Sequence, residues 1–384
     1  MRGWIGGSIM KILSLFSNIG VAEAYLSNIG AHVVLANELI ERRAALYSRI
    51  YPDTQMICGD ITSFDIYNKV VESAKKRGVD TIMATPPCQG ISRAGKQHKN
   101  DVRNLLILPV IDIVLDLFPK YVFIENVPKF VETYISVDGK DVLISDLISS
   151  KLSANYDISV NVIDTKFYGV PQTRQRAILL LTRKDIEKKW RLPDPDANFV
   201  TLEDAIGNLP SLDPFVKDVS ESELLEIFPN FYNKLAAAKK VSPWHFPPEH
   251  IKRQVITMIH TPTGKTAFDN SKYVPIKADG TPVTGYKSTY RRLRWNDPAS
   301  TVTMDNRKIS SQNNVHPGRY IGLDKNGDVM YSDPRALTLF ELMKIMSLPE
   351  SWPLPKDANP TFVRTIIGEG IPPLFVKKVF EKVL

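Results

Sequence analysis

The chain has little cysteine and no long apolar run. Two of its 384 residues are cysteines, Cys58 and Cys88, so a disulfide framework is excluded and a reducing cytoplasm is expected. The longest apolar stretch, residues 105–118, is shorter than the roughly 20 residues of a membrane span and is interrupted by proline and aspartate. The first residues lack the apolar core of a signal peptide. We therefore expect a cytoplasmic protein that has no membrane partner.

Metal-binding spacings are also missing. There are six histidines, but no Cys/His cluster has the spacing of a zinc site. His245 and His250 are separated by Phe-Pro-Pro-Glu, and the prolines prevent a helical pair. We therefore expect no metal.

The first 185 residues alternate between apolar, strand-like runs and helical patterns. This alternation predicts an α/β fold with a doubly wound, mainly parallel sheet, which binds ligands beyond the carboxyl ends of its strands. Strands are predicted at 11–17, 32–38, 55–61, 80–86, 121–127, 158–164 and 177–183, and helices at 22–28, 40–50, 66–77 and 104–118.

After residue 190 the alternation stops and turn-forming residues become frequent. We predict a first domain with the α/β fold at 1–195, a smaller irregular domain at 196–345, and helices at 346–384 that return to the first domain. Helical patterns are present at 202–209, 336–349 and 374–384.

Basic and aromatic residues are concentrated in the irregular part. Residues 231–300 contain twelve Lys or Arg, four Asp or Glu, and nine Phe, Tyr or Trp, whereas the whole chain has a net charge of +7. Neutralisation of phosphates and stacking on bases both use this combination. A solvated basic face with core aromatics is an equally good interpretation of composition alone.

Polar residues end several of the predicted strands. Glu38 lies about twenty residues after the first strand's loop, a spacing at which an acid binds ribose hydroxyls. Asp60, after the third strand, could accept a hydrogen bond from an adenine amino group. The loop after the first strand has a single glycine, Gly20, and lacks the G-x-G-x-x-G that a pyrophosphate needs. The pattern favours an adenosine ligand without phosphates, such as S-adenosylmethionine, and disfavours a dinucleotide-dependent oxidoreductase.

The two cysteines have different settings. Cys58 lies within an apolar strand and is expected to be a buried structural residue. Cys88 follows two prolines on a loop at the ligand-binding edge, where a thiolate is a candidate nucleophile.

At this point the chain resembles the DNA (cytosine-5) methyltransferases of the bacterial restriction–modification type. The family's blocks occur in its order: LFSNIG, ANE, GDI, TPPCQGISRAGKQ, DVRNLL, FIENVP, YGVPQTRQRAILL, HPGRY, PRALTLFELMKIMSLP and IGEGIPP. The resemblance covers most of the chain outside 213–290. The family usually has glycine where Asn18 stands, and commonly Asn and Ala where Glu369 and Gly370 stand.

The resemblance implies that 1–195 is the catalytic and cofactor-binding domain and that 196–345 is the target-recognition domain. It also implies a mechanism. Cys88 would add to C6 of a flipped cytosine and so activate C5 for methylation. Glu125 would face N3 of the base, and Asn126 would orient Glu125 and the cysteine loop. Arg174 would bind O2 of the base, and Arg176 would support Glu125 or the loop.

The resemblance also implies the binding residues. S-adenosylmethionine would be held by residues of the strand-end loops and of the last block, namely Phe16, Ser17, Asn18, Gly20, Glu38, Asp60, Ile61, Pro86, Leu106, Glu369 and Gly370. Double-stranded DNA would be contacted by Gln89 and Ser92 near the flipped base, and by Arg291, Arg292 and Arg294 from a predicted strand at 290–295. A purely surface role for that basic strand is equally plausible.

The expected protein is a monomer whose cognate restriction endonuclease, where one exists, acts separately. Two alternatives remain. A tRNA cytosine-5 methyltransferase shares PPCQ and ENV, although no cysteine follows Cys88 as that family's Cys-Phe-Thr signature requires. A catalytically idle DNA-binding module is disfavoured by the intact Cys88, Glu125 and Arg174.

Overall fold

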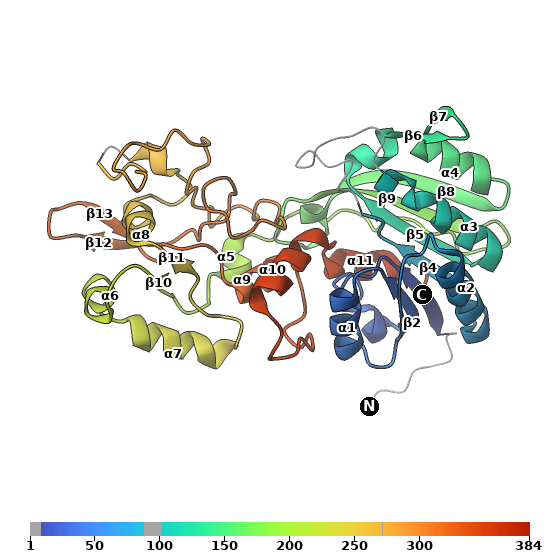
Figure 1. The fold of residues 1–384 in the computed structure, drawn as a ribbon, viewed down its shortest axis with the longest axis horizontal. Helices are drawn as coiled ribbons and strands as arrows, with labels where there is room; N and C mark the ends of the chain where they lie inside the picture. The colour runs from blue at the N-terminus through green and yellow to red at the C-terminus, as the bar shows by residue number, and fades with distance from the viewer. Residues whose placement is uncertain (1–8, 88–101, 271) are drawn as a thin grey trace.

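A seven-stranded sheet forms the centre of the larger of two lobes (Figure 1). The computed structural model describes residues 9–87, 102–270 and 272–384. The strand order is β3-β2-β1-β4-β5-β9-β8, in which β9 runs antiparallel to both of its neighbours. The strands are β1 (Met10–Leu15), β2 (Ala31–Glu38), β3 (Gln55–Cys58), β4 (Thr81–Ala84), β5 (Tyr121–Asn126), β8 (Tyr156–Asp164) and β9 (Gln175–Arg183). The predicted α/β fold with a mainly parallel sheet is confirmed.

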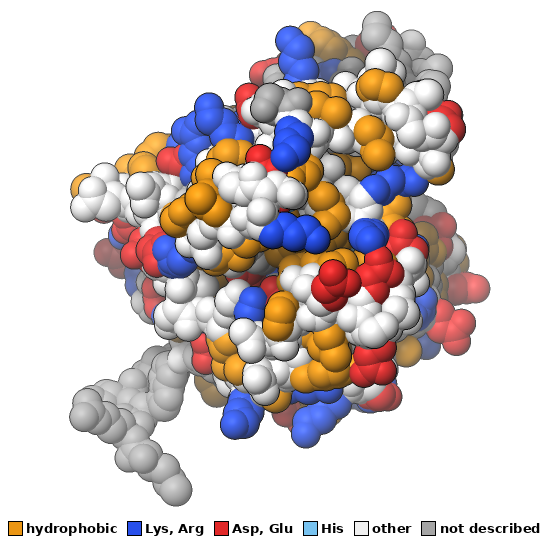
Figure 2. All heavy atoms as spheres, turned by 90° about the vertical axis from the view of Figure 1, so that its left-hand side faces the viewer, with side chains coloured by type: hydrophobic (Ala, Val, Ile, Leu, Met, Phe, Trp, Pro, Cys, Tyr) orange, Lys and Arg blue, Asp and Glu red, His pale blue; other side chains and the backbone are white. Residues whose placement is uncertain are grey.

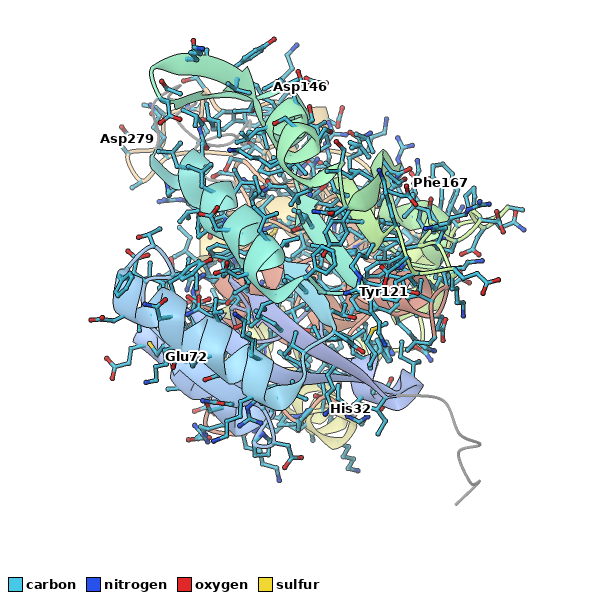
Figure 3. All side chains as sticks on the ribbon, turned by 90° about the vertical axis from the view of Figure 1, so that its right-hand side faces the viewer. His32, Glu72, Tyr121, Asp146, Phe167 and Asp279 are labelled. Atoms are coloured by element: carbon cyan, nitrogen blue, oxygen red, sulfur yellow. The ribbon has the colours of Figure 1, made fainter. Side chains whose placement is uncertain are left out.

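Helices cover both faces of this sheet, which explains why its central strands are almost continuously apolar. On one face α2 (Phe64–Arg77), α3 (Ile107–Leu117) and α4 (Ile144–Leu152) share one core with the strands. Figure 3 shows these helices side by side, with Glu72 and Asp146 marking α2 and α4. On the other face α11 (Pro373–Phe380) packs its Phe375 and Phe380 with Phe123 of β5 and with Trp190. The last helix therefore completes the sheet's cover.

Most of the predicted helices of this lobe are present. The segment 40–50 forms α1 (Glu41–Ile50), which lies against β2 and β3. The segment 22–28 was expected to be helical, but it forms turns followed by a short 3₁₀ helix. The remaining short elements of the lobe are η1 (Leu26–Ile29), η2 (Val102–Leu106), η3 (Pro128–Glu132), η4 (Thr165–Tyr168) and the hairpin of β6 (Tyr134–Val137) and β7 (Lys140–Leu143).

The smaller lobe has short elements and small sheets, as its turn-rich sequence indicates. It has two cores of its own, one centred on Val216, Phe231 and Val255, the other on Met258, Ala267 and Tyr290. Its elements are β10 (Phe215–Val216), α6 (Glu221–Ile227), α7 (Phe231–Val241), β11 (Glu249–His250), α8 (Lys252–Ile259), η5 (Ala267–Asp269), β12 (Tyr320–Leu323) and β13 (Val329–Tyr331).

A third core joins the two lobes. It combines Ile19 and Val21, which follow β1, with Leu293, Ala299 and Val302 of the irregular segment. Buried residues of three helices complete it: α5 (Leu202–Ile206), α9 (Leu339–Ile345) and α10 (Pro360–Glu369). This core contains residues from each of the three predicted domains.

In the described residues, no helix combines the length and the apolarity that crossing a membrane would require.

Candidate active site

The loop after β1 has an unusual backbone. Phe16, Asn18 and Gly20 all have positive φ, at 58°, 54° and 78°. Asparagine tolerates this left-handed region better than most residues, which explains how Asn18 occupies a position where a glycine would be easier. At Gly20 an added Cβ would lie 2.1 Å from the ring of Tyr51, so a side chain is excluded there by space as well as by φ. The loop is therefore bent tightly at the carboxyl end of β1.

Glu38, at the end of β2, fixes this loop. Its carboxylate is buried and accepts hydrogen bonds from the backbone N–H of Asn18 (2.9 Å) and of Ile40 (2.9 Å). Ser17 completes the junction, because its N–H and its hydroxyl both donate to the carbonyl of Asn37. The first two strand ends thus form one rigid edge that contains a carboxylate.

Asn18 also contacts the end of α10. Its Nδ2 donates to Glu369 Oε2 (3.3 Å), and Arg43 of α1 pairs with the same carboxylate at 3.0 Å. Gly370 follows directly, and an added Cβ there would lie 3.0 Å from Val21. Asn18 and Glu369, two of the three positions that differ from the family pattern, are therefore in direct contact with each other.

A second group of polar contacts lies behind the loop. The hydroxyl of Tyr51 donates to the Gly20 carbonyl (2.5 Å) and accepts from the indole N–H of Trp352 (3.1 Å). Glu23 is buried and accepts a hydrogen bond from the Tyr47 hydroxyl. Burial raises the pKa of Glu23 to about 7.

Apolar side chains are exposed beside these carboxylates. Leu39 (61%) and Ile40 (43%) directly follow Glu38. Asp60 is exposed and is held in a turn, where its Oδ1 accepts from the N–H and the hydroxyl of Thr62, while Ile61 packs in the core. Sequence reasoning missed Leu39. The sequence did contain a signal for it, because Leu39 is an apolar residue between the acid that ends β2 and the polar helix α1.

Cys58 differs from expectation. It is the last residue of β3 and is exposed, because the strand ends there and its side chain no longer points into the core. The neighbouring Glu41 and Glu38 add to a burial effect that raises the pKa of this thiol, so it is a poor nucleophile.

An ion pair lies at the carboxyl end of β5. Arg176 Nε is 2.6 Å from Glu125 Oε1, and both side chains are about nine-tenths buried. The antiparallel pairing of β5 and β9 brings these residues together, since Glu125 pairs with Ile178, two residues beyond Arg176. An arginine beside a carboxylate can hold it in one orientation and supply further donors to a ligand.

Asn126 connects this strand end to the proline segment. Its Nδ2 donates to the Pro86 carbonyl (3.0 Å), and its Oδ1 accepts from the N–H of Val127 (2.9 Å). Leu106 ends η2 and is half-buried. Cys88, Gln89 and Ser92 lie outside the described residues. The described edge therefore consists of residues 16–20, Glu38, Asp60, Pro86, Glu125, Asn126 and Arg176.

Arg174, which the resemblance places at O2 of the base, is buried between the two lobes. It is 1% exposed, and its guanidinium donates to the carbonyls of Val302 (2.7 Å) and Gly368 (2.9 Å). The side-chain oxygen of Gln172 also accepts a hydrogen bond from the Val302 N–H (2.8 Å). The block YGVPQTRQR therefore has two functions. Arg174 stabilises the contact between the lobes, and Arg176 lies beside Glu125 at the carboxyl end of β5.

The predicted strand at 290–295 is wrong, and so is the DNA contact of Arg292. The segment is irregular, with one isolated bridge between Arg292 and Val315. Arg292 is 1% exposed and donates to the carbonyls of Met258, His316 and Asp333. Arg294 is exposed and Arg291 is half-buried.

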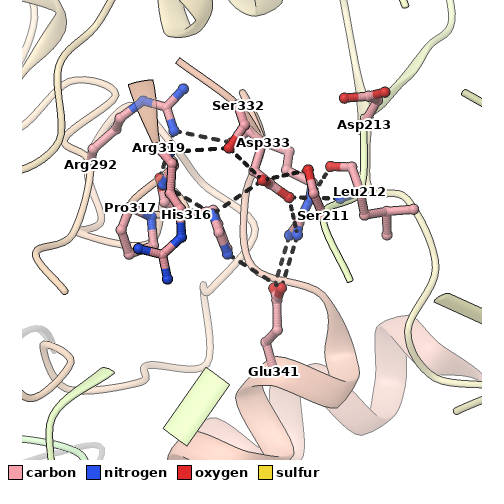
Figure 4. Close-up of polar contacts among 12 residues, drawn as sticks. Ser211, Leu212, Asp213, Arg292, His316, Pro317, Arg319, Ser332, Asp333 and Glu341 are labelled. Carbon is pink, nitrogen blue, oxygen red and sulfur yellow. Dashed lines mark hydrogen bonds and ion pairs between the residues drawn. The ribbon is translucent and has the colours of Figure 1, made fainter. Parts of the chain in front are cut away.

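Arg292 belongs to a buried polar network (Figure 4). Arg335 lies between Asp333 (2.9 Å) and Glu341 of α9 (2.8 Å), and Asp333 also accepts from the N–H of Leu212 (2.8 Å). Burial lowers the pKa of the adjacent His316 to about 4, so this ring is neutral at physiological pH. The network ties the linker before the smaller lobe to α9, which is a structural function.

The edge has the groups that S-adenosylmethionine would require. Asn18 Oδ1 is buried and has no hydrogen-bond donor among the described residues, so it is available to an ammonium group. The carboxylates of Glu38 and Asp60 suit hydroxyl and amino donors, and Leu39 offers an apolar surface to a flat base. Within 9–87, 102–270 and 272–384, no three His, Cys, Asp or Glu side chains come together as a possible metal site.

Comparison with known proteins agrees with this geometry. The profile described as "C-5 cytosine-specific DNA methylase" matches residues 10–384. The Type II methyltransferase M1.HgaI of Avibacterium volantium is 41% identical over 97% of both chains. The Type II methyltransferase M.XorII of Xanthomonas oryzae is 24% identical over 97% of this chain and 84% of that protein.

A solved structure has the same fold. It is a putative DNA modification methyltransferase encoded within a prophage of Escherichia coli, with a TM-score of 0.63 and 19% identity over 97% of this chain and 98% of that one. From the profile match and the 41% identity, the chain belongs to the C-5 cytosine-specific DNA methylase family.

Proposed function

We propose that this protein transfers a methyl group from S-adenosylmethionine to C5 of cytosine within a specific sequence of double-stranded DNA. It acts as the modification enzyme of a restriction–modification system, as a monomer, and any cognate endonuclease acts separately. The observation that carries the proposal is the ion pair of Glu125 and Arg176 at the carboxyl end of β5. The contact of Asn126 with Pro86 links that pair to the segment that leads to Cys88.

The chemistry depends on a nucleophile and a charge-stabilising pair. The Cys88 thiolate adds to C6 of a cytosine flipped out of the duplex, and the electron pair of the C5–C6 bond moves toward N3. Glu125 faces N3 and, as an acid, donates its proton or a hydrogen bond to the electron pair that develops there. Arg176 orients Glu125 and offers its remaining N–H groups to O2 of the base. S-adenosylmethionine supplies the methyl group when it is bound. Loss of the C5 proton then expels the thiolate and restores the aromatic ring.

The strand-end loops are the proposed cofactor site. Glu38 and Asp60 accept from ribose and adenine donors, Leu39, Phe16 and Leu106 contact the base, and Asn18 with Glu369 receives the methionine end. Replacement of Glu38 or Asp60 by alanine is expected to weaken cofactor binding by about 1–3 kcal/mol.

Bisulfite sequencing of DNA from cells that express the protein tests the proposal directly, because it reports the product and the target together. Cys88→Ser is expected to abolish methylation and to retain the fold. Duplexes with 5-fluorocytosine at the target are expected to trap a covalent adduct with the wild type, since fluorine cannot leave as a proton. Methylation of tRNA in place of DNA, or turnover by Cys88→Ser, would contradict the proposal.

A further inference from the structure

A recess of about 560 Å³ lies in the smaller lobe, away from the strand-end site. Two short segments line it: Thr266, Phe268 and Asp269 on one side, and Val283, Thr284, Gly285, Lys287 and Arg291 on the other. The recess is wide open to solvent, so it could face the edge of a large ligand but could not enclose a small one. In Figures 1 and 3 this part of the lobe lies on the same side of the molecule as the β6–β7 hairpin, and Asp279 marks it in Figure 3.

The two segments that line the recess are supported by a backbone hydrogen bond and by the core of the smaller lobe. The Ala267 N–H donates to the Thr289 carbonyl (3.0 Å), so the two segments are joined by their backbones. Ala267 and Tyr290 are buried together in the core of this lobe. At Gly285 an added Cβ would come within 3.0 Å of Thr289 Oγ1. The recess is therefore supported by the folded core.

The charged groups of the recess are of opposite sign, and one of them is fixed. Thr266 donates from its N–H (2.7 Å) and its hydroxyl (3.0 Å) to Asp269 Oδ2. These backbone and side-chain hydrogen bonds, with the charges of Lys265 and Arg291, lower the pKa of Asp269, so the carboxylate is ionised. The Arg291 guanidinium makes no hydrogen bond or ion pair with another described residue, and it can rotate toward a ligand.

The surroundings of the recess favour nucleic acid. From 265 to 294 the chain has seven Lys or Arg and two Asp. Figure 2 shows basic side chains across the upper half of the face at this end of the molecule, among exposed apolar ones. A phosphate would be attracted by Lys287 and Arg291 but repelled by the fixed Asp269. A ligand with acceptors and a donor side by side satisfies both Arg291 and Asp269.

We propose that this recess reads a G·C base pair through its major-groove edge, with Arg291 donating to O6 and N7 of guanine and Asp269 accepting from N4 of the paired cytosine. Guanine alone presents two adjacent acceptors that match the guanidinium fork, and cytosine presents the donor that a carboxylate needs. An A·T pair offers a donor to Asp269 but no such pair of acceptors on one base. This inference rests on the proposed DNA methylation and adds a specificity-determining pair to it.

The test uses duplexes that carry the motif found by bisulfite sequencing. Each guanine outside the target pair is replaced in turn by 7-deazaguanine, which lacks the N7 acceptor. For the wild type, one of these replacements is expected to weaken binding at least 5-fold. Arg291→Ala is expected to bind the unmodified duplex at least 5-fold more weakly than the wild type does. The 7-deazaguanine replacement that weakens the wild type is expected to have no effect on this variant. Asp269→Asn is expected to relax the preference for cytosine at the paired position.

Arg294→Ala is the matched control, because Arg294 is two-thirds exposed and does not line the recess. It is expected to weaken all duplexes alike and to retain the wild-type sensitivity to 7-deazaguanine. Thermal melting of each variant checks the fold. An Arg291→Ala protein that stays sensitive at every position, or a motif without a second G·C pair, overturns the assignment of the recess and leaves methylation by the wild type intact. A wild type that methylates no DNA overturns both proposals.

Discussion

At the residue scale, the two arginines of the QTRQR block are separated by one residue but differ in function. Arg176 pairs with Glu125, whereas Arg174 bonds to backbone carbonyls of the C-terminal half. Arg176→Lys keeps the charge and loses the planar fork. We expect turnover to fall about 10- to 100-fold, since the orientation of Glu125 and a donor to the base are lost. The melting temperature should change little, and radiolabelled methyl transfer measures the effect.

Arg174→Lys is the matched comparison. Its expected effect is on stability, because one ammonium cannot bond both the Val302 and the Gly368 carbonyls. The free energy of unfolding should fall by about 1–3 kcal/mol in a urea titration. The opposite result, with catalysis lost in Arg174→Lys and retained in Arg176→Lys, would reverse the two assignments.

Glu23 makes the stability of the protein depend on pH. Burial raises its pKa to about 7, so folding favours the protonated carboxyl. Its contribution is fully present below the ordinary pKa of about 4.5 and is lost as the pH rises through 7. Glu23→Gln should therefore stabilise the protein at pH 8.5 relative to pH 5.5, by up to about 2 kcal/mol. Melting curves across this range measure the difference, and parallel curves for both proteins would rule the effect out.

At the scale of elements, the contact between the first loop and α10 is formed by two residues that depart from the family pattern. Asn18→Gly keeps the left-handed backbone and removes the amide, and Glu369→Gln removes the charge that Arg43 pairs with. We expect the two effects on unfolding to be coupled by about 1 kcal/mol in a double-mutant cycle. Additive effects would show that the contact contributes nothing.

Arg49→Ala is the control for that cycle. Arg49 lies on the same helix as Arg43 and pairs with Asp357, but both side chains of that pair are more than half exposed. Such a pair contributes little, so the control should leave the free energy of unfolding almost unchanged.

The strands were predictable because seven apolar runs alternate with helical patterns, and all seven form strands of one sheet. The segment 22–28 has helical periodicity but forms turns and η1, so periodicity alone did not identify the element. The segment 290–295 alternates like a strand, yet Arg292 is buried by carbonyls that come from residues 258, 316 and 333. Contacts between residues so distant in sequence leave no local pattern.

The site was predictable to a similar extent. Glu38, Asp60, Glu125 and Asn126 were identifiable because each ends a strand of a parallel sheet. The support of Glu125 by Arg176 was expected from the family resemblance, and the two side chains form an ion pair. The bonds of Arg174 to the Val302 and Gly368 carbonyls were not expected, because these partners lie far away in the sequence. Leu39 was missed because an apolar residue next to a strand is usually part of the core. Only the structure shows that Leu39 is exposed.

At the scale of the whole molecule, the lobes are joined by a shared core. Ile19 and Val21 pack with Leu293 and Val302, so the loop at the proposed cofactor site and the segment leading out of the smaller lobe form one unit. Arg174 adds hydrogen bonds at the same junction. A change in the position of the smaller lobe, as DNA binding would impose, therefore bears directly on the loop after β1.

The excess of basic residues in the smaller lobe predicts how DNA affinity responds to salt. Each phosphate neutralised by Lys or Arg contributes about −0.9 to the slope of log affinity against log salt concentration. Lys265→Ala removes an exposed ammonium next to the recess. We expect this variant to bind all duplexes more weakly and to have a slope smaller in magnitude by about 1.

Lys252→Ala serves as the control for this prediction, because the Lys252 ammonium is paired with Glu223. The slope of this control should match that of the wild type. Fluorescence anisotropy between 50 and 300 mM salt, as a rough working range for such titrations, measures the slopes, and equal slopes for Lys265→Ala and the wild type would place the DNA backbone on another face of the lobe.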